Sequence, residues 1–294
     1  MSVEAFDLQL AGRAVSGLRR RAAGPRVLAL HGWLDNAASF LPLLPHVPDL
    51  DLALLDLPGH GLSDHLPAGA DYTPASAICH VLDVADALGW DRFTLLGHSL
   101  GAGIASMVAA VSERIERLIA IEALGGLRGP ENETAQRLRE HIQARRQPHP
   151  RPLRVFPNLA APVRARMMVN QLSEADARRL VERGVREVDG GYSWRTDQRL
   201  MWPTAVRLTE GQIDDLLKAI TCPVQVIYAT PAQPYYPEPL RSERLKYLRD
   251  GRLATLPGSH HVHMEAPGPV AEIIRAFVRD TRGSERLMEV IVTD

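Results

Sequence analysis

The chain has 294 residues, of which 45% are apolar and 23% are charged, and its formal net charge is −1. This length can bury a large core, either as one α/β domain or as one domain that carries an insertion. The near-neutral charge gives no reason to expect a nucleic acid as a partner.

The cysteines and the N-terminus bear on the compartment. Cys79 and Cys222 lie far apart and fit neither a metal-ligand spacing nor a disulfide framework. In the stretch MSVEAFDLQL no basic segment leads into an apolar one, so it lacks the pattern of a signal peptide. No apolar run approaches the roughly 18 residues of a membrane span. We therefore expect a cytoplasmic protein that does not associate with membranes.

Strands and helices alternate along the first part of the chain. In order, the predicted elements are a hairpin around residues 11–13, a strand in RVLALHGW, a short helix at residues 36–45, a strand at residues 50–57, a helix from Thr73-Pro74 to Leu88, a strand, turn and helix in DRFTLLGHSLGAG, and a strand in RIERLIAIEA. Thr73 is the expected N-cap of its helix, and Gly89 ends that helix.

The alternation stops for about a hundred residues and then resumes in CPVQVIYAT, residues 239–248, GRLATLPG and GPVAEIIRAFVRD. The pattern predicts a mostly parallel sheet with helices on both faces. The interruption is largely helical, in ENETAQRLREHIQARR, SEADARRLVERGV and TEGQIDDLLKAI. We interpret residues 125–220 as a helical cap over one edge of the sheet, with residues 1–124 and 221–294 forming the core domain. The tail SERLMEVIVTD is either an added strand or a partner contact.

A nucleophile is predicted at the turn Gly97-His98-Ser99-Leu100-Gly101, which has the pattern G-x-S-x-G. An apolar strand enters this turn and a helix of small residues leaves it, as such an elbow requires. The glycines allow a tight turn with Ser99 at its apex, where the start of the helix favours negative charge. Because a serine hydroxyl is a weak nucleophile, it needs a base. The segment LPGSHHVHMEAPGPV, after the last strand of the core, offers His260, His261 and His263.

The motifs HGW, DLPGHGLSD, GHSLG and GSHHVHMEAP follow one another in the order found in α/β-hydrolases, and the chain resembles that family over everything except the cap. The resemblance implies an α/β-hydrolase fold. In such proteins the base often lies five residues before the acidic residue of a GHxxxxE-like loop, which indicates His260 when counted from Glu265. His261 is the alternative, and His263 is expected to make structural hydrogen bonds.

The third member of the expected triad departs from the commonest pattern of the family. Many α/β-hydrolases carry the acid in a turn that here reads ATPAQPYYPEP, which has no aspartate, and Glu238 lies too far along. An imidazole needs a carboxylate that fixes its tautomer. Glu122 ends the strand after the elbow helix, so it should lie beside Ser99. Asp56 is the weaker candidate and is expected to order the LPGHG turn.

A stretch similar to IAIEAL holds a glutamate in some haloalkane dehalogenases, whose nucleophile is aspartate. Serine at the elbow therefore argues for acyl transfer to water. HGWLDNAASF and IEALGG also resemble serine hydrolase-like proteins.

Two backbone amides are expected to form the oxyanion hole, those of Leu100 and Trp33. The indole of Trp33 and the side chain of His98 are the expected substrate contacts, with His98 also packing locally. His31 and His60 are interpreted as residues that hold their loops.

The cap carries more Arg and Lys than Asp and Glu, which favours an anionic substrate only if these arginines do more than solvate helix faces. Several cap residues are candidates for the pocket wall or for a small core of the cap itself: Phe156, Met167, Met168, Trp194, Met201 and Trp202.

The sequence therefore predicts a serine hydrolase that cleaves a small-molecule carboxylic ester or related acyl compound, with no metal and no organic cofactor. The same triad serves acyl transfer, thioester cleavage and carbon–carbon hydrolysis. A binding protein that keeps the scaffold without turnover is a further alternative. The substrate and the oligomeric state stay open.

Overall fold

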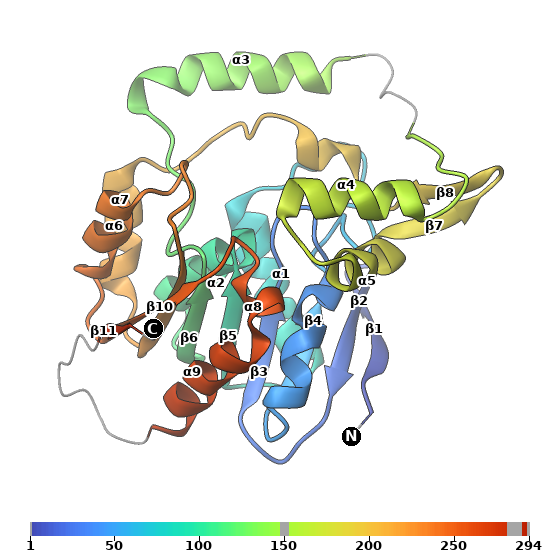
Figure 1. The fold of residues 1–294 in the computed structure, drawn as a ribbon. Helices are drawn as coiled ribbons and strands as arrows, with labels where there is room; N and C mark the ends of the chain where they lie inside the picture. The colour runs from blue at the N-terminus through green and yellow to red at the C-terminus, as the bar shows by residue number, and fades with distance from the viewer. Residues whose placement is uncertain (1, 148–152, 281–289, 293–294) are drawn as a thin grey trace.

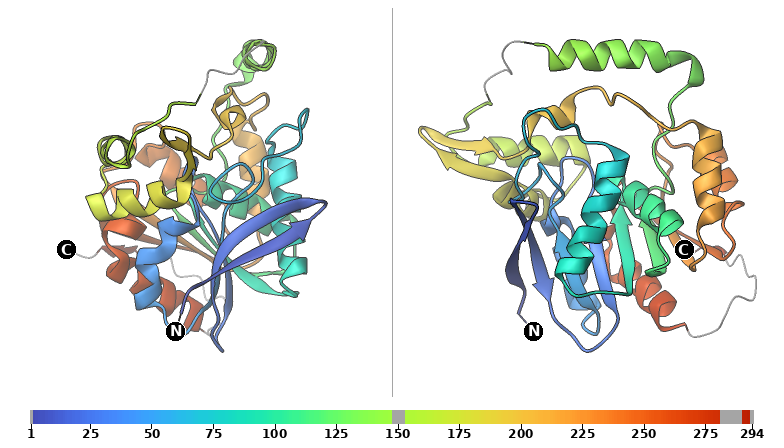
Figure 2. Two further views of the ribbon diagram at one scale, coloured as in Figure 1. Left: turned by 90° about the vertical axis from the view of Figure 1, so that its right-hand side faces the viewer. Right: turned by 180° about the vertical axis from the view of Figure 1, so that it is seen from behind.

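The computed structural model describes residues 2–147, 153–280 and 290–292. Within these ranges the central sheet has nine strands in the order β1-β2-β4-β3-β5-β6-β9-β10-β11, with helices on both faces (Figures 1 and 2). The strands are β1 (Glu4–Leu10), β2 (Arg13–Arg20), β3 (Arg26–Leu30), β4 (Asp51–Leu55), β5 (Phe93–His98), β6 (Ile115–Ile121), β9 (Val224–Thr230), β10 (Gly251–Pro257) and β11 (Val290–Val292). β2 is antiparallel to β1 and β4, and the other neighbours are parallel. The predicted fold class is confirmed.

Apart from one short helix at Val262–Glu265, which was expected to be a loop, the helices that cover the sheet begin and end close to the predicted residues. They are η1 (Ala37–His46), α1 (Pro74–Ala87), α2 (Leu100–Val111), α6 (Glu210–Ala219), α7 (Glu238–Leu245), α8 (Val262–Glu265) and α9 (Pro267–Arg279). Thr73 caps α1 in a reciprocal pair of hydrogen bonds with Ser76, and Gly89 follows α1 with a φ of 69°. η1 is a 3-10 helix that contains Pro42 and Pro45, whose missing N–H groups disfavour α-helical bonding.

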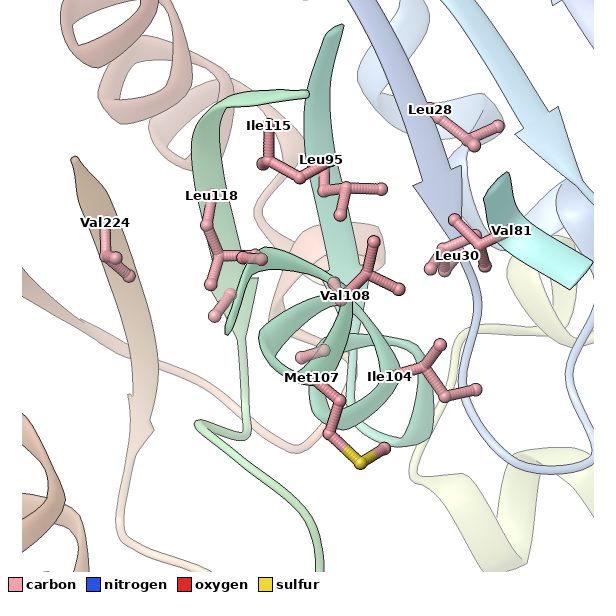
Figure 3. Packing of buried hydrophobic residues seen from close by; sticks show 14 of the residues in the cluster. Leu28, Leu30, Val81, Leu95, Ile104, Met107, Val108, Ile115, Leu118 and Val224 are labelled. Atoms are coloured by element: carbon pink, nitrogen blue, oxygen red, sulfur yellow. The ribbon is translucent and has the colours of Figure 1, made fainter. Parts of the chain in front are cut away.

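The core consists of two apolar layers, one on each face of the sheet, because successive side chains of a strand point to opposite faces. In β3, Leu28 and Leu30 belong to the layer under α1 and α2, whereas Val27 and Ala29 belong to the layer under η1 and α9. Figure 3 shows side chains of α2, among them Val108, packed against strands β5 and β6. α2 is therefore fixed on the sheet directly behind the Ser99 turn.

The inserted segment lies at one end of the sheet, above it in Figure 1. Its described elements are η2 (Glu131–Glu133), α3 (Thr134–Arg145), α4 (Ala160–Asn170), α5 (Glu174–Gly184), β7 (Val185–Val188), β8 (Gly191–Trp194) and η3 (Gln198–Met201). α4 and α5 share a small apolar cluster of their own, which also takes in Met264. α6, assigned to the cap by sequence, packs instead against α2 through Ile213 and Leu217 in the main core. The insertion also contains the hairpin β7–β8 besides its helices.

The C-terminal tail supplies the last strand of the sheet. Val290–Val292 form β11, parallel to β10, so an added strand is what these three residues form. The rest of the tail lies outside the described residues. None of the helices in the described ranges is both long and apolar enough to cross a membrane.

Candidate active site

Ser99 lies at the apex of the turn between β5 and α2, with a φ of 52° and a ψ of −114°. The flanking glycines are required by close packing. A Cβ atom at Gly97 would lie 2.5 Å from the backbone of Ala102, and one at Gly101 would lie 1.9 Å from the carbonyl oxygen of Leu30. The turn is as tight as the sequence predicts, and any side chain at either glycine would distort it.

Positive φ angles recur at the ends of three neighbouring strands. Ser99 follows β5, Glu122 follows β6 with a φ of 60°, and Leu34 lies in the loop after β3 with a φ of 60°. Non-glycine residues in this region store about 1–3 kcal/mol of strain each, and such residues cluster at functional sites. The strain identifies this edge of the sheet as the candidate site.

Glu122 is buried, with 2% of its surface exposed, and its carboxylate has three sets of partners. Oε1 accepts a hydrogen bond from the backbone N–H of Ala229 at 2.5 Å, and Oε2 lies 3.2 Å from Nδ1 of His260. Arg241 places Nη2 3.4 Å from both oxygens. A buried carboxylate is tolerated only with partners of this kind. The structure thus brings together Glu122 and His260, as the sequence analysis expects.

Arg241 was missed by the sequence analysis. Its side chain is 1% exposed, and besides Glu122 it donates to the carbonyl oxygens of Ala229 at 2.8 Å and Tyr236 at 3.0 Å. Its guanidinium also lies 4.5 Å from the centre of the Tyr228 ring. The planar group therefore fixes both the carboxylate and the chain that follows β9. No local sequence signal marks this arginine, because Glu122 lies 119 positions away.

His260 sits between Glu122 and the pocket, with about a fifth of its side chain exposed. The hydroxyl of Tyr235 lies 3.2 Å from Nδ1 and 3.4 Å from Nε2 of His260. In the part of the chain that the structure describes, His260 makes no hydrogen bond to Ser99, which is common in enzymes without substrate. Burial, followed by the charge of Glu122, raises the pKa of Tyr235 to about 12, so this hydroxyl stays protonated. The sequence analysis did not single out Tyr235.

The loop that carries His260 is held by three contacts. Nε2 of His98 lies 2.8 Å from the carbonyl oxygen of His260, so it donates there. Nε2 of His261 lies 3.0 Å from Oδ2 of Asp35, and Oε2 of Glu265 accepts from the backbone N–H of Ser259 at 2.9 Å. Nε2 of His261 is thus occupied by Asp35. Asp35 was not predicted as a site residue, although it lies two positions after the HGW motif.

The expected hydrogen-bonding role of His263 is wrong. The side chain is fully buried, and neither ring nitrogen has a hydrogen-bond partner among the described residues. The ring packs instead against Phe40 and His98, with centroid distances of 5.3 and 4.2 Å. Burial lowers the pKa of His263 well below its usual value, so the ring is neutral. It serves as a packing residue under the loop.

Three buried side chains, Asp35, His98 and His261, place one ligand atom each within 4.8 Å of one another, which is a spacing that a metal ion can use. Positive charge is already present there, since Nη1 of Arg166 lies 3.1 Å from Oδ1 of Asp35. Burial alone would raise the pKa of Asp35, but His261 and then Arg166 outweigh it and hold that pKa well below its usual value. The carboxylate is therefore ionised and neutralised by side chains.

Asp56 and His31 lie where the sequence analysis expects loop-ordering residues. Asp56 is fully buried, accepts from the backbone N–H groups of Ala37 and Leu62, and pairs with Arg183 at 2.8 Å. Nε2 of His31 accepts from the N–H of Leu57 at 3.0 Å, and burial lowers the pKa of His31 to about 4. These contacts fix the turn after β4.

His60 packs edge-on against His31, at a centroid distance of 4.9 Å, and burial lowers the pKa of His60 to about 3. The ring is therefore neutral and holds the same turn.

A pocket of about 770 Å³ opens at this edge and is lined by Ser99, His260, Glu122 and Trp33 among others. Leu100 is the first residue of α2, so its N–H has no partner within the helix. The N–H of Trp33 donates to no protein acceptor in the described ranges. Its indole is 52% exposed and donates to the carbonyl oxygen of Leu200 at 3.1 Å. His98 is fully buried but reaches the pocket wall.

The predicted apolar cap residues divide between the two readings. Met201 and Trp202 line the pocket. Phe156 packs edge-on against Trp194, which with Met167 belongs to the cap's own cluster, and Met168 is 83% exposed.

Comparisons with known proteins identify the family to which this fold belongs. A family model described as the α/β-hydrolase fold matches residues 25–228. A serine hydrolase-like protein from Dictyostelium discoideum is 31% identical over 269 residues, which are 86% of this chain and 74% of that protein. Human serine hydrolase-like protein 2 is 32% identical and the match covers 88% of each chain. The crystal structure of a hypothetical protein from Pseudomonas aeruginosa PAO1 has a TM-score of 0.86 at 35% identity, covering 95% of this chain and 100% of that one.

Proposed function

The chain belongs to the α/β-hydrolase fold family, among its serine hydrolase-like proteins, and from this premise we propose that it hydrolyses carboxylic esters through a triad of Ser99, His260 and Glu122. The observation that carries the proposal is the buried carboxylate of Glu122, 3.2 Å from Nδ1 of His260. With Nδ1 donating to Glu122, Nε2 is left as the basic nitrogen.

In the proposed reaction, Ser99 Oγ attacks the ester carbonyl while Nε2 of His260 takes the hydroxyl proton. The amides of Leu100 and Trp33 stabilise the oxyanion, and the alcohol leaves with the proton that His260 returns. A water molecule, activated by the same nitrogen, then hydrolyses the acyl-enzyme and releases the acid. Glu122 holds the imidazole in the right tautomer and stabilises its positive charge in both steps.

One observation favours a second candidate, a binding protein without turnover. The hydroxyl of Tyr235 lies 3.4 Å from Nε2 of His260, the nitrogen that Ser99 would need. For catalysis, the substrate must displace this contact. Acyl transfer, thioester cleavage and carbon–carbon hydrolysis use the same triad, and a substrate screen separates them.

Reaction with a fluorophosphonate tests whether Ser99 is activated, because Oγ displaces fluoride and forms a stable adduct. Intact mass spectrometry should give one adduct on the wild-type protein and none on Ser99→Ala. Absence of the adduct on folded wild-type protein would contradict ester hydrolysis and favour the binding protein. A screen of neutral esters and thioesters then identifies the bond that is cleaved.

A further inference from the structure

The charges that line the pocket are unevenly compensated. Its carboxylates, Asp35 and Glu122, are paired with Arg166 and Arg241. Among its arginines, Arg244 is paired with Glu210 through contacts of 2.7 and 3.0 Å. Arg137 and Arg207 are the two lining arginines that remain. The pocket therefore carries positive charge in excess of its own acidic groups.

Arg137 and Arg207 lie beside each other. A Cβ atom at Gly129 would lie 2.9 Å from Cβ of Arg207 and 3.8 Å from Nε of Arg137. The backbone N–H of Gly129 donates to the carbonyl oxygen of Leu208 at 2.9 Å, which joins the segment before α3 to the segment that carries Arg207. Because both arginines lie next to the same glycine, their positive charges repel each other unless an anion lies between them.

The two arginines have few partners of their own. Among the described residues, the one ion pair of Arg137 is with Glu133 at 3.3 Å; 17% of the Arg137 side chain and 51% of the Glu133 side chain are exposed. Arg207 is half-buried and forms no hydrogen bond or ion pair within the described residues. Burial, followed by the charge of Arg137, lowers the pKa of Arg207. Both residues line the pocket, so an anion bound there can supply the missing partner.

At least one member of the pair comes from the inserted segment rather than from the sheet that carries the elbow. Arg137 belongs to the first turn of α3, which lies across the top of the molecule in Figure 1, whereas Ser99 lies at the edge of the sheet. The rest of the pocket lining is largely apolar, with Met107 and Trp202 as large members. A ligand that fills this pocket can therefore contact the predicted triad, apolar side chains and both arginines.

We propose that Arg137 and Arg207 bind an anionic group, such as a carboxylate, at the end of the substrate remote from the ester. The substrate class is then an ester with an apolar stem and an acidic end. Arginine suits this task because its planar donors match a carboxylate in a bidentate geometry. The inference rests on the proposed function for the position of the scissile bond, but binding at the arginine pair can be measured without turnover.

The test compares two series of p-nitrophenyl esters of α,ω-dicarboxylic acids. In one series the second carboxyl group is free, and in the other it is a methyl ester. For the best chain length, kcat/KM should be at least about tenfold higher with the free carboxylate, because a charge-assisted hydrogen bond contributes on this scale. The preference should appear mainly in KM. Arg207→Met and Arg137→Met should each reduce the ratio of the two kcat/KM values toward one. Arg139→Met, an exposed residue of the same helix, should leave the ratio unchanged.

Failure of this inference is distinguishable from failure of the proposed function. Equal or lower kcat/KM for the acidic esters, with neutral esters cleaved, overturns the arginine site alone. If no ester is cleaved, calorimetry on Ser99→Ala decides, using the monomethyl esters of the same diacids as ligands. Binding by Ser99→Ala that is lost when Arg207→Met is added to it supports the site. Equal binding by the single and the double variant overturns it.

Discussion

At the scale of single residues, the central feature is a carboxylate placed on an uncommon strand. Glu122 follows β6, and its charge is compensated by the N–H of Ala229, the imidazole of His260 and the guanidinium of Arg241. The turn after β9 has no acid of its own, and near the end of β9 the backbone N–H of Ala229 donates to Glu122. The imidazole of His260 thus has a carboxylate partner that comes from the end of β6 and not from the turn after β9.

Arg241→Met should lower both stability and activity. The change leaves Glu122 with one partner fewer in a buried site, and breaking a buried ion pair costs about 3–5 kcal/mol. We expect the free energy of unfolding in urea to fall on that scale, and kcat to fall at a temperature where the variant is still folded. Glu238→Gln is the matched control, since Glu238 is 63% exposed and lies 3.8 Å from the same guanidinium. If Arg241→Met behaved like this control, the guanidinium would not be what holds Glu122 in place.

At the scale of elements, the loop between β10 and α9 is built around histidines that burial keeps neutral. Burial lowers the pKa values of His263, in this loop, and of His98, at the end of β5. The centroids of the two rings lie 4.2 Å apart. In the unfolded chain a histidine binds a proton below pH ~6.5. The unfolded state therefore gains protons as the pH falls below that value, while the folded state does not. The contribution that these two neutral histidines make to stability is therefore fully present above pH ~6.5 and is lost progressively below it.

His263→Leu tests this pH dependence. Leucine removes one buried histidine without leaving an unpartnered ring, so the free energy of unfolding should depend less on pH. Between pH 6 and pH 5 the slope should be smaller by about 1 kcal/mol per pH unit than in the wild type. Urea unfolding at several pH values measures both slopes. Identical slopes would mean that His263 takes up a proton in the folded protein.

At the scale of the whole molecule, features set by neighbouring residues were predictable from sequence. The hairpin turns at Ala11 and Gly12, which have φ angles of 49° and 77°, and Thr73 caps α1. The glycines around Ser99 predicted a tight elbow because their requirement is local. Parallel strands also bring their carboxyl ends to one edge, which was enough to place Glu122 near Ser99.

Contacts between distant segments were not predictable in the same way. Arg241 and Tyr235 reach the site from the chain after β9, and nothing in their own neighbourhoods indicates it. α6 has the helical pattern expected of the cap, but its apolar face packs on α2. His263 was expected to form structural hydrogen bonds, yet its ring packs against other rings. Such outcomes depend on which surfaces meet in the folded chain.

The assignment of Glu122 as the acid of the triad is tested most directly by the rate at which a fluorophosphonate labels Ser99 in the wild type and in Glu122→Gln. Glutamine keeps the size of the side chain but cannot stabilise a charged imidazole, and comparable changes in other triads reduce turnover by about 10⁴-fold. We expect the second-order rate constant for labelling to fall at least about 100-fold, whereas Asp56→Asn should not reproduce this loss at matched folded fraction. A wild-type labelling rate in folded Glu122→Gln would contradict the assignment of Glu122 as the acid of the triad.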